Sequence, residues 1–343
     1  MSLKRRRTFF RRLLKTVLII AAISLYAHFI HPGLFFSKPA LMEPDSAAMK
    51  KGKPVSFMSG SRWLKGRIIA PSRHTHKLPV IIFCAGSGGN ISYASSHYPA
   101  LLQYMLQDNL PEDSVVLLYM DKRGVGESEG SWYNTTFEER AADVKAAADY
   151  LKTLPYIDNR RIALVGHGEG GWVVQLCLAE YPSAFAGGIS MAGSALNLRN
   201  QVTDELAGSA MCQDSVSEWE AVRKARITLE VEIFMSMLFP LREEWKQLSV
   251  TRRFEIAPYI KKIQKPLLYL FCENDARVSA THCLSALKTI FPAGYPPFIQ
   301  VALIKATNHR FRVSPRCYTG TATLPFSEEA RQYINNWVRN ILL

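Results

Sequence analysis

A regular alternation of apolar, strand-like runs with helical patterns constrains the fold of this chain more than any other feature. From Val55 onward six such runs recur, namely "PVIIFCAG", "SVVLLYMD", "RIALVG", "FAGGISMAG", "PLLYLFCEND" and "FIQVALIKA". Their near-continuous apolar character is typical of strands that are covered on both faces. The alternation therefore predicts an α/β fold, with a mostly parallel sheet flanked by helices.

Two of the predicted helices have clear start signals. Thr136, followed three residues later by Glu139, fits a capping box at the start of an alanine-rich helix between the second and third runs. Ser327, shortly after Pro325, is the expected N-cap of the last helix.

Residues 196–260 interrupt the alternation, because they carry helical patterns and no strand-like run. Within them Ile227, Val231, Phe234 and Leu238 fall on one face at helical spacing. We interpret this segment as a helical cap. Its apolar face is expected either to pack on the core or to shape a pocket for an acyl group.

The N-terminus is strongly basic. Seven cations precede the first acidic residue and supply +7 of the formal net charge of +13: Lys4, Arg5, Arg6, Arg7, Arg11, Arg12 and Lys15. The rest of the chain is only mildly basic and shows no basic–aromatic interleaving, which argues against nucleic acid as a partner.

The apolar stretch Thr16–Phe36 follows this basic cluster directly. Positive residues before it predict a single membrane-spanning anchor with a cytoplasmic N-terminus and an exported remainder. A cleaved signal peptide, leaving a secreted or periplasmic protein, remains the alternative. The predicted organisation is thus an anchor or signal segment at 1–36, a polar linker at 37–52 and one large domain at 53–343.

The chain has six cysteines. An even number in an exported protein permits disulfides, but their spacing shows neither a compact disulfide framework nor a metal-binding pattern. Cys84 and Cys272 lie in strand-like runs and are expected to be small core residues. No metal or organic cofactor is implied.

Four motifs follow the predicted strands in a fixed order. A glycine-rich turn containing Ser87 follows the first run, and D-x-R-G-x-G-x-S begins at Asp121 after the second. The third run leads into G-H-G-E-G at residues 166–170, and Asp275 and His309 follow the fifth and sixth. In this order the motifs resemble the α/β-hydrolase superfamily, in its serine-hydrolase branch of bacterial peptidases and esterases, over roughly residues 53–343.

The resemblance implies a Ser-His-Asp site for an ester, thioester or amide substrate. His309 would be the general base and Asp275 the residue that orients it. The backbone N–H groups of Glu169 and Ser87 would form the oxyanion hole. Asp121 and Arg123 are expected to hold a turn. His167, beside the elbow, is expected to be structural.

The chain departs from this pattern at the nucleophile, because Gly168 stands where the serine belongs. Glycine has no hydroxyl with which to attack a carbonyl. Natural loss of the serine, its deliberate replacement and an error in the sequence would all produce this residue. Two functional hypotheses follow: an impaired hydrolase, or a pseudoenzyme that uses the pocket for binding or scaffolding.

Overall fold

The computed structural model describes residues 3–29, 52–71, 75–89, 114–318 and 324–343. The chain divides into two compact units, Met1–Met42 and Glu43–Leu343, which are considered separately. The predicted linker at 37–52 lies almost entirely outside the described residues.

The described part of the first unit is one helix, α1 (Leu3–Phe29), which contains the basic cluster and the start of the apolar stretch. The rest of the predicted anchor, up to Phe36, lies outside the described residues. No helix in the described ranges combines the length and the apolar character needed to cross a bilayer. The predicted membrane span is therefore not supported.

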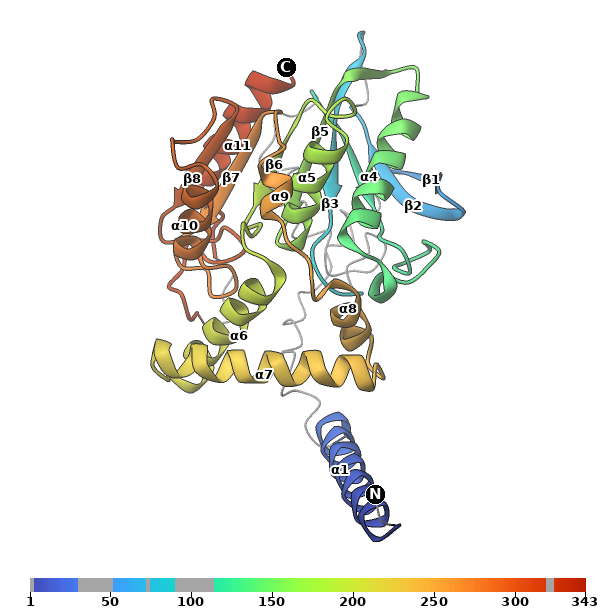
Figure 1. Ribbon diagram of the computed structural model, residues 1–343. Helices are drawn as coiled ribbons and strands as arrows, with labels where there is room; N and C mark the ends of the chain where they lie inside the picture. The colour runs from blue at the N-terminus through green and yellow to red at the C-terminus, as the bar shows by residue number, and fades with distance from the viewer. Residues whose placement is uncertain (1–2, 30–51, 72–74, 90–113, 319–323) are drawn as a thin grey trace. The chain divides into compact units, whose positions relative to one another are not determined.

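The second unit is built on an eight-stranded sheet in the order β1-β2-β4-β3-β5-β6-β7-β8 (Figure 1). The hairpin β1–β2 and the pair β2–β4 are antiparallel, whereas every pairing from β4 to β8 is parallel. The strands are β1 (Lys53–Ser59), β2 (Arg62–Ile69), β3 (Leu78–Cys84), β4 (Val116–Met120), β5 (Ile157–His167), β6 (Gly187–Met191), β7 (Leu267–Cys272) and β8 (Ile299–Ile304). The six apolar runs correspond to β3 to β8, so the predicted mostly parallel sheet is confirmed.

Helices cover both faces of the sheet. Side chains of α4 (Phe137–Lys152), α5 (Glu169–Glu180) and α10 (Ala280–Ile290) share one apolar cluster with alternate strand residues such as Ile82. The intervening strand residues, such as Ile81, pack on the opposite face against α11 (Glu328–Ile341). The start signals are confirmed, because Thr136 caps α4 in a full capping box and Ser327 caps α11.

Residues 196–260 form the predicted helical segment, consisting of α6 (Leu198–Asp214), α7 (Glu218–Leu238), α8 (Glu243–Thr251) and the short α9 (Ala257–Ile260). In Figure 1 the long helix α7 lies beyond α6 and α8, away from the sheet. We refer to α6, α7 and α8 together as the cap.

The interpretation of the apolar face of α7 was wrong. Its four residues face solvent, with exposed fractions of 59% for Ile227, 46% for Val231, 51% for Phe234 and 49% for Leu238. The helix has a second apolar stripe on its other side, and that stripe is the buried one: Ala221, Ala225, Leu229 and Ile233. The alanines in this stripe allow close packing against α6.

Candidate active site

The turn between β5 and α5 has the backbone geometry expected of a nucleophile elbow. Gly168 has φ 56° and ψ −122°, directly between the last strand residue, His167, and the first helical residue, Glu169. A positive φ is strained for a residue with a side chain and is readily adopted by glycine. The elbow geometry is therefore formed around a glycine, which adopts it without side-chain strain.

The flanking glycines are required by close packing, as predicted from the motif. A Cβ atom on Gly170 would lie 2.0 Å from the carbonyl oxygen of Cys84 at the end of β3. A Cβ on Gly166 would lie 2.1 Å from the carbonyl oxygen of Gly170. These distances are too short for any side chain, so helix α5 can begin this close to the sheet only with glycine here.

His309 lies over the elbow. A Cβ atom on Gly168 would be 3.6 Å from Nε2 of His309. Its other ring nitrogen, Nδ1, is 2.7 Å from Oδ2 of Asp275. A carboxylate only accepts, so Nδ1 donates, and in the neutral imidazole the lone pair of Nε2 would face the elbow. The structure thus brings together Gly168, His309 and Asp275, three residues that are far apart in the sequence.

Asp275 is buried and fully supplied with donors. Its second oxygen, Oδ1, accepts hydrogen bonds from the backbone N–H groups of Arg277 at 2.7 Å and Val278 at 2.9 Å. Burial alone would raise the pKa of Asp275. The nearby His309 and the three hydrogen bonds outweigh burial, and the net pKa lies below its ordinary value. Asp275 is therefore held as a carboxylate that can orient His309.

His167, the residue before Gly168, contacts His309 through a hydrogen bond and through ring packing. Its Nε2 donates to the backbone carbonyl of His309 over 2.8 Å, and the two rings pack with centroids 4.5 Å apart. Burial, reinforced by the charge of His309, lowers the pKa of His167 to about 3. His167 is thus a neutral structural residue, as expected, and it ties the His309 loop to the elbow.

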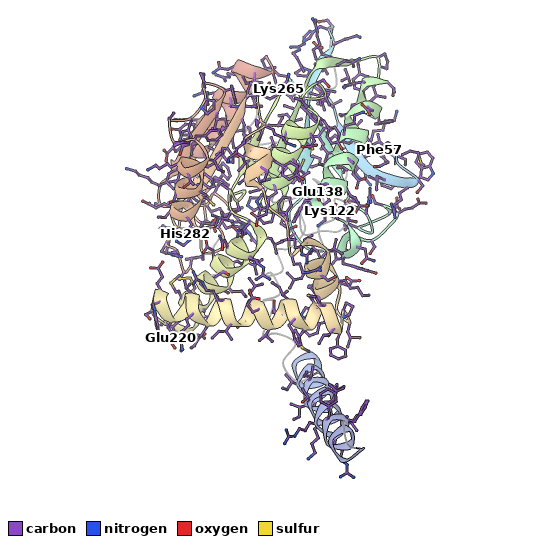
Figure 2. The ribbon with its side chains drawn as sticks, viewed as in Figure 1. Phe57, Lys122, Glu138, Glu220, Lys265 and His282 are labelled. Carbon is purple, nitrogen blue, oxygen red and sulfur yellow. A yellow bond between two sulfur atoms is a disulfide. The ribbon has the colours of Figure 1, made fainter. Side chains whose placement is uncertain are left out.

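Two buried cations hold the glycine-rich turn after β3. Lys122 donates from Nζ to the carbonyl oxygens of Gly86 at 2.9 Å and Gly88 at 2.6 Å. Arg140 of α4 donates to the carbonyl oxygen of Ala85 and pairs with the carboxylate of Glu169 at 2.9 Å. Lys122, labelled in Figure 2, is buried.

The contacts of Arg140 connect the two segments that are predicted to form the oxyanion hole. Arg140 contacts both the turn that carries Ser87 and the first residue of α5, Glu169. As the first helical residue, Glu169 has a backbone N–H that is not used within α5. The carbonyls of the turn are occupied by Lys122, and Ser87 itself is exposed. The oxyanion role of both N–H groups remains a prediction.

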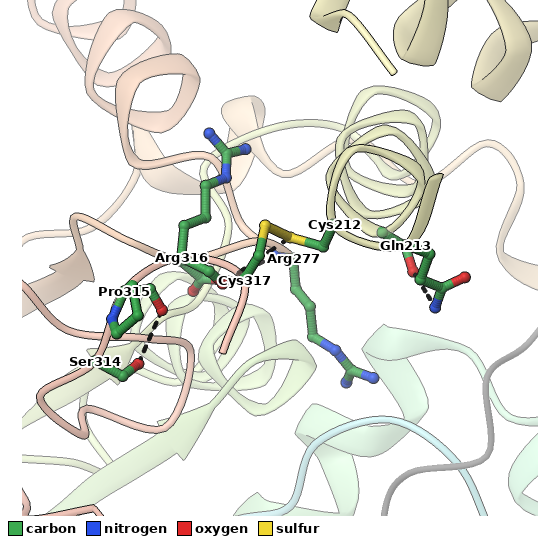
Figure 3. Close-up of a disulfide and its surroundings, with 9 residues drawn as sticks. Cys212, Gln213, Arg277, Ser314, Pro315, Arg316 and Cys317 are labelled. Carbon is green, nitrogen blue, oxygen red and sulfur yellow. Dashed lines mark hydrogen bonds between the residues drawn. A yellow bond between two sulfur atoms is a disulfide. The ribbon is translucent and has the colours of Figure 1, made fainter. Parts of the chain in front are cut away.

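The cap helix α6 is fastened to both loops of the His–Asp pair. Gln201 donates to the carbonyl of Arg277, two residues after Asp275, over 2.8 Å. At the other end of α6, Cys212 forms a disulfide with Cys317, in the segment after His309 (Figure 3). The sequence permitted disulfides but did not identify this pair. Cys84 and Cys272 are free and buried, as expected.

Among the described residues, neither Cys84 nor Ser190 is placed to act as a nucleophile. Burial raises the pKa of the Cys84 thiol to about 12, so it does not form a thiolate at neutral pH. Ser190 is fully buried in β6, where its hydroxyl contacts Gln175. Within the described ranges no three His, Cys, Asp or Glu side chains gather as metal ligands do.

The sequence reasoning missed Lys122 and Arg140. A signal for Arg140 was present, because it lies beside Ala141 and four residues before Val144, on the buried stripe of a capped helix. A charged residue in such a stripe needs a buried partner. Arg123 meets its expectation: it joins the D-x-R-G turn to α4 through Glu139 at 2.7 Å and Asp143 at 2.8 Å.

Comparison with known proteins identifies the family that this chain matches. The profile of the prolyl oligopeptidase family, peptidase family S9, matches residues 103–324. The uncharacterized protein YfhR of Salmonella typhi is 33% identical over 99 residues, which make up 29% of this chain and 30% of YfhR. The match therefore spans less than a third of that relative.

Solved structures share the fold at low sequence identity. An esterase, Pf2001 of Pyrococcus furiosus, is 16% identical with a TM-score of 0.60, covering 89% of this chain and 98% of the esterase. The acylaminoacyl peptidase of Pyrococcus horikoshii is 20% identical with a TM-score of 0.56, covering 85% of this chain and 42% of the peptidase. These likenesses show the α/β-hydrolase fold, and they agree with the predicted resemblance.

Proposed function

Because this chain belongs to the prolyl oligopeptidase family, we propose that its site is that of an acyl hydrolase of the Ser-His-Asp type from which the nucleophilic hydroxyl is missing. One observation carries the proposal: the Cβ position of Gly168 lies 3.6 Å from Nε2 of a histidine whose Nδ1 is bound to a buried aspartate. The substrate class is an ester, thioester or amide, in a small molecule or a peptide.

With a serine at position 168, the residues present would complete an acyl-transfer cycle. The serine Oγ would attack the substrate carbonyl while its proton passes to Nε2 of His309, which then protonates the leaving group. Asp275 would stabilise the charged imidazole. The backbone N–H groups of Glu169 and Ser87 would receive the oxyanion. Water would then release the acyl group, with His309 again as the base.

As the chain stands, the described residues place no nucleophilic side chain at the elbow, and water would be the attacking group. His309 can act as a base toward a water molecule beside Gly168, so slow turnover of a reactive ester is the most that the proposal allows. In serine hydrolases, loss of the nucleophile costs about a millionfold in turnover, and roughly a thousandfold over the uncatalysed rate remains from the rest of the site.

The decisive test is the substitution Gly168→Ser, assayed with short-chain nitrophenyl esters. We expect turnover to rise by on the order of a thousandfold or more over the unmodified chain, because the acyl-enzyme route becomes available. The matched control is Gly168→Ala, which adds the same backbone strain without a hydroxyl and should stay inactive. A folded Gly168→Ser protein as inert as the alanine variant would contradict the proposal.

A second candidate function, binding without turnover, is favoured by the elbow itself. Gly168 gives a turn without side-chain strain and puts no nucleophile beside His309, so a bound acyl compound would not be cleaved there. Binding of an ester to the unmodified chain, measured by calorimetry with no product formed over the same period, would support this role. Product formation at ordinary enzymatic rates would exclude it.

We also propose that the domain works in an oxidising compartment, after export. The Cys212–Cys317 disulfide supports this, since disulfides persist mainly outside the reducing cytosol. The test is thiol alkylation of the protein taken directly from cells: two protected cysteines are expected, and six alkylated after denaturation would contradict export.

A further inference from the structure

The outer face of α7 is an apolar surface that the described part of the chain leaves uncovered. Its exposed fractions are high for large apolar side chains, reaching 58% for Met237 and 64% for Leu241 just beyond the helix. With them lie Val231, Phe234 and Leu238, at spacings of three and four residues that place them on one side. We name this set the α7 stripe: Val231, Phe234, Met237, Leu238 and Leu241. Contiguous exposed apolar patches of this kind mark interaction sites.

The N-terminal half of α7 carries exposed aromatic and cationic side chains. Trp219 is 73% exposed, and the Arg223 guanidinium lies 5.3 Å from its ring centroid. Of the carboxylates nearby, Glu220 pairs with Lys224 and Glu230 with Arg199 of α6, while Glu218, in the first turn of α7, forms no ion pair among the described residues. Of the ion pairs between described residues, none involves Arg223 or Arg226. The outer face of α7 therefore runs from two exposed guanidinium groups to the apolar stripe.

We infer that this face docks on the surface of a lipid bilayer that contains anionic lipid. Guanidinium groups bind phosphate, a tryptophan is stable at the headgroup level, and an apolar helix face inserts at the boundary of the acyl chains. The helix is held parallel to that surface by packing of its opposite face on α6 and α8.

Pairing with a second copy fits this face less well. In an antiparallel pair, Arg223 and Arg226 of one copy would oppose Leu238 and Leu241 of the other and lose water without gaining a carboxylate. In a parallel pair, the guanidinium groups would oppose one another. A bilayer avoids both costs, because it offers phosphates and an apolar layer at the same surface.

The separate N-terminal unit shows the same combination independently. Along α1, Arg11, Arg12 and Lys15 alternate with exposed apolar side chains: Phe9, Phe10, Leu13, Leu14, Leu18 and Ile19. Stable attachment of a protein to a membrane usually takes two signals. The α7 stripe supplies one that belongs to the folded domain.

The test places a fluorophore on the stripe of the full chain. Phe234→Cys is labelled with an environment-sensitive dye under non-reducing conditions, where the four free cysteines are buried and the fifth and sixth form the disulfide. The matched control is Tyr333→Cys on α11, at a position 41% exposed. Vesicles of phosphatidylcholine with a minority of phosphatidylglycerol are then added.

We expect a blue shift and a several-fold rise in emission at position 234 and none at 333, weaker with phosphatidylcholine alone. In unlabelled protein, Phe234→Glu with Leu238→Glu should reduce vesicle partitioning by about tenfold, because two side chains that insert become charged. No vesicle-dependent change at 234, or equal changes at both positions, would overturn the inference. So would a shift already present without lipid, which would assign the stripe to a protein partner.

Discussion

The two halves of the candidate site differ in what carries their geometry. In the acid–base half, side chains make the site: His309 and Asp275 are joined by a 2.7 Å hydrogen bond, and Asp275 is held by two backbone N–H groups. In the elbow half, the backbone makes the site, because Gly168 keeps the φ and ψ of a nucleophile turn with no side chain. The backbone of such a turn can therefore keep its geometry without a side chain at its centre.

The comparison predicts that the acid–base half still functions once a nucleophile is restored. In a Gly168→Ser background, Asp275→Asn should lower turnover of a nitrophenyl ester by about 10⁴-fold, because His309 loses the partner that fixes its tautomer. The measurement is kcat at several pH values. If Asp275→Asn had little effect there, the hydrogen bond would be structural and the two halves would not act as one site.

The disulfide is a further difference between the two halves, because it supports only the loops of the acid–base half. Cys212→Ser should lower the free energy of unfolding by about 2–5 kcal/mol, because the bond spans 105 residues and its loss enlarges the unfolded ensemble. Urea unfolding measures this. Cys283→Ser, at a buried free cysteine, is the control for the loss of a sulfur alone. Equal effects of the two changes would refute a special role for the bond.

The elbow half should be sensitive to volume rather than to charge. Gly170→Ala is expected to cost about 3 kcal/mol of stability, because its Cβ would lie 2.0 Å from the Cys84 carbonyl oxygen and must displace α5. Gly60→Ala is the matched control: nothing lies within 4 Å, so only its positive φ is strained, at about 1 kcal/mol. Similar losses from both would show that α5 can shift freely.

His167, which connects the two halves through His309, should make the stability of the protein depend on pH. The pKa of His167 is lowered to about 3, whereas the unfolded chain binds a proton near the ordinary value of 6.5. Between these values the unfolded state binds more protons, so stability falls as the pH falls from 6.5 toward 3. In His167→Gln, whose amide can still donate to the His309 carbonyl, this fall should be shallower. An identical pH dependence in both proteins would remove His167 from the explanation.

Most of the sheet and the positions of three site residues were predictable, because they depend on local patterns. Near-continuous apolar runs identified β3 to β8, and a residue directly after a strand of a parallel sheet lies at its carboxyl edge, as Asp275 and His309 do. The orientation of α7 was not predictable. Both of its sides are apolar, and the packed one is decided by the small side chains of Ala221 and Ala225 against α6.

The contacts that hold the site in place could also not be predicted from the sequence. Lys122 acts through backbone carbonyls of Gly86 and Gly88, and carbonyl positions follow from the path of the chain rather than from residue identity. The pairing of Cys212 with Cys317 has the same origin, because it joins the cap to a loop more than a hundred residues later. Contacts of this range become visible only when the topology is known.

The Cys212–Cys317 bond has a consequence for proteolysis. A protease that cut the chain once between these two cysteines would leave two fragments joined covalently, with Asp275 and His309 both inside the closed loop. Such a nicked molecule would migrate as one band on a gel until it is reduced. Cleavage inside α7 or α8 would thus leave the fragments attached to each other.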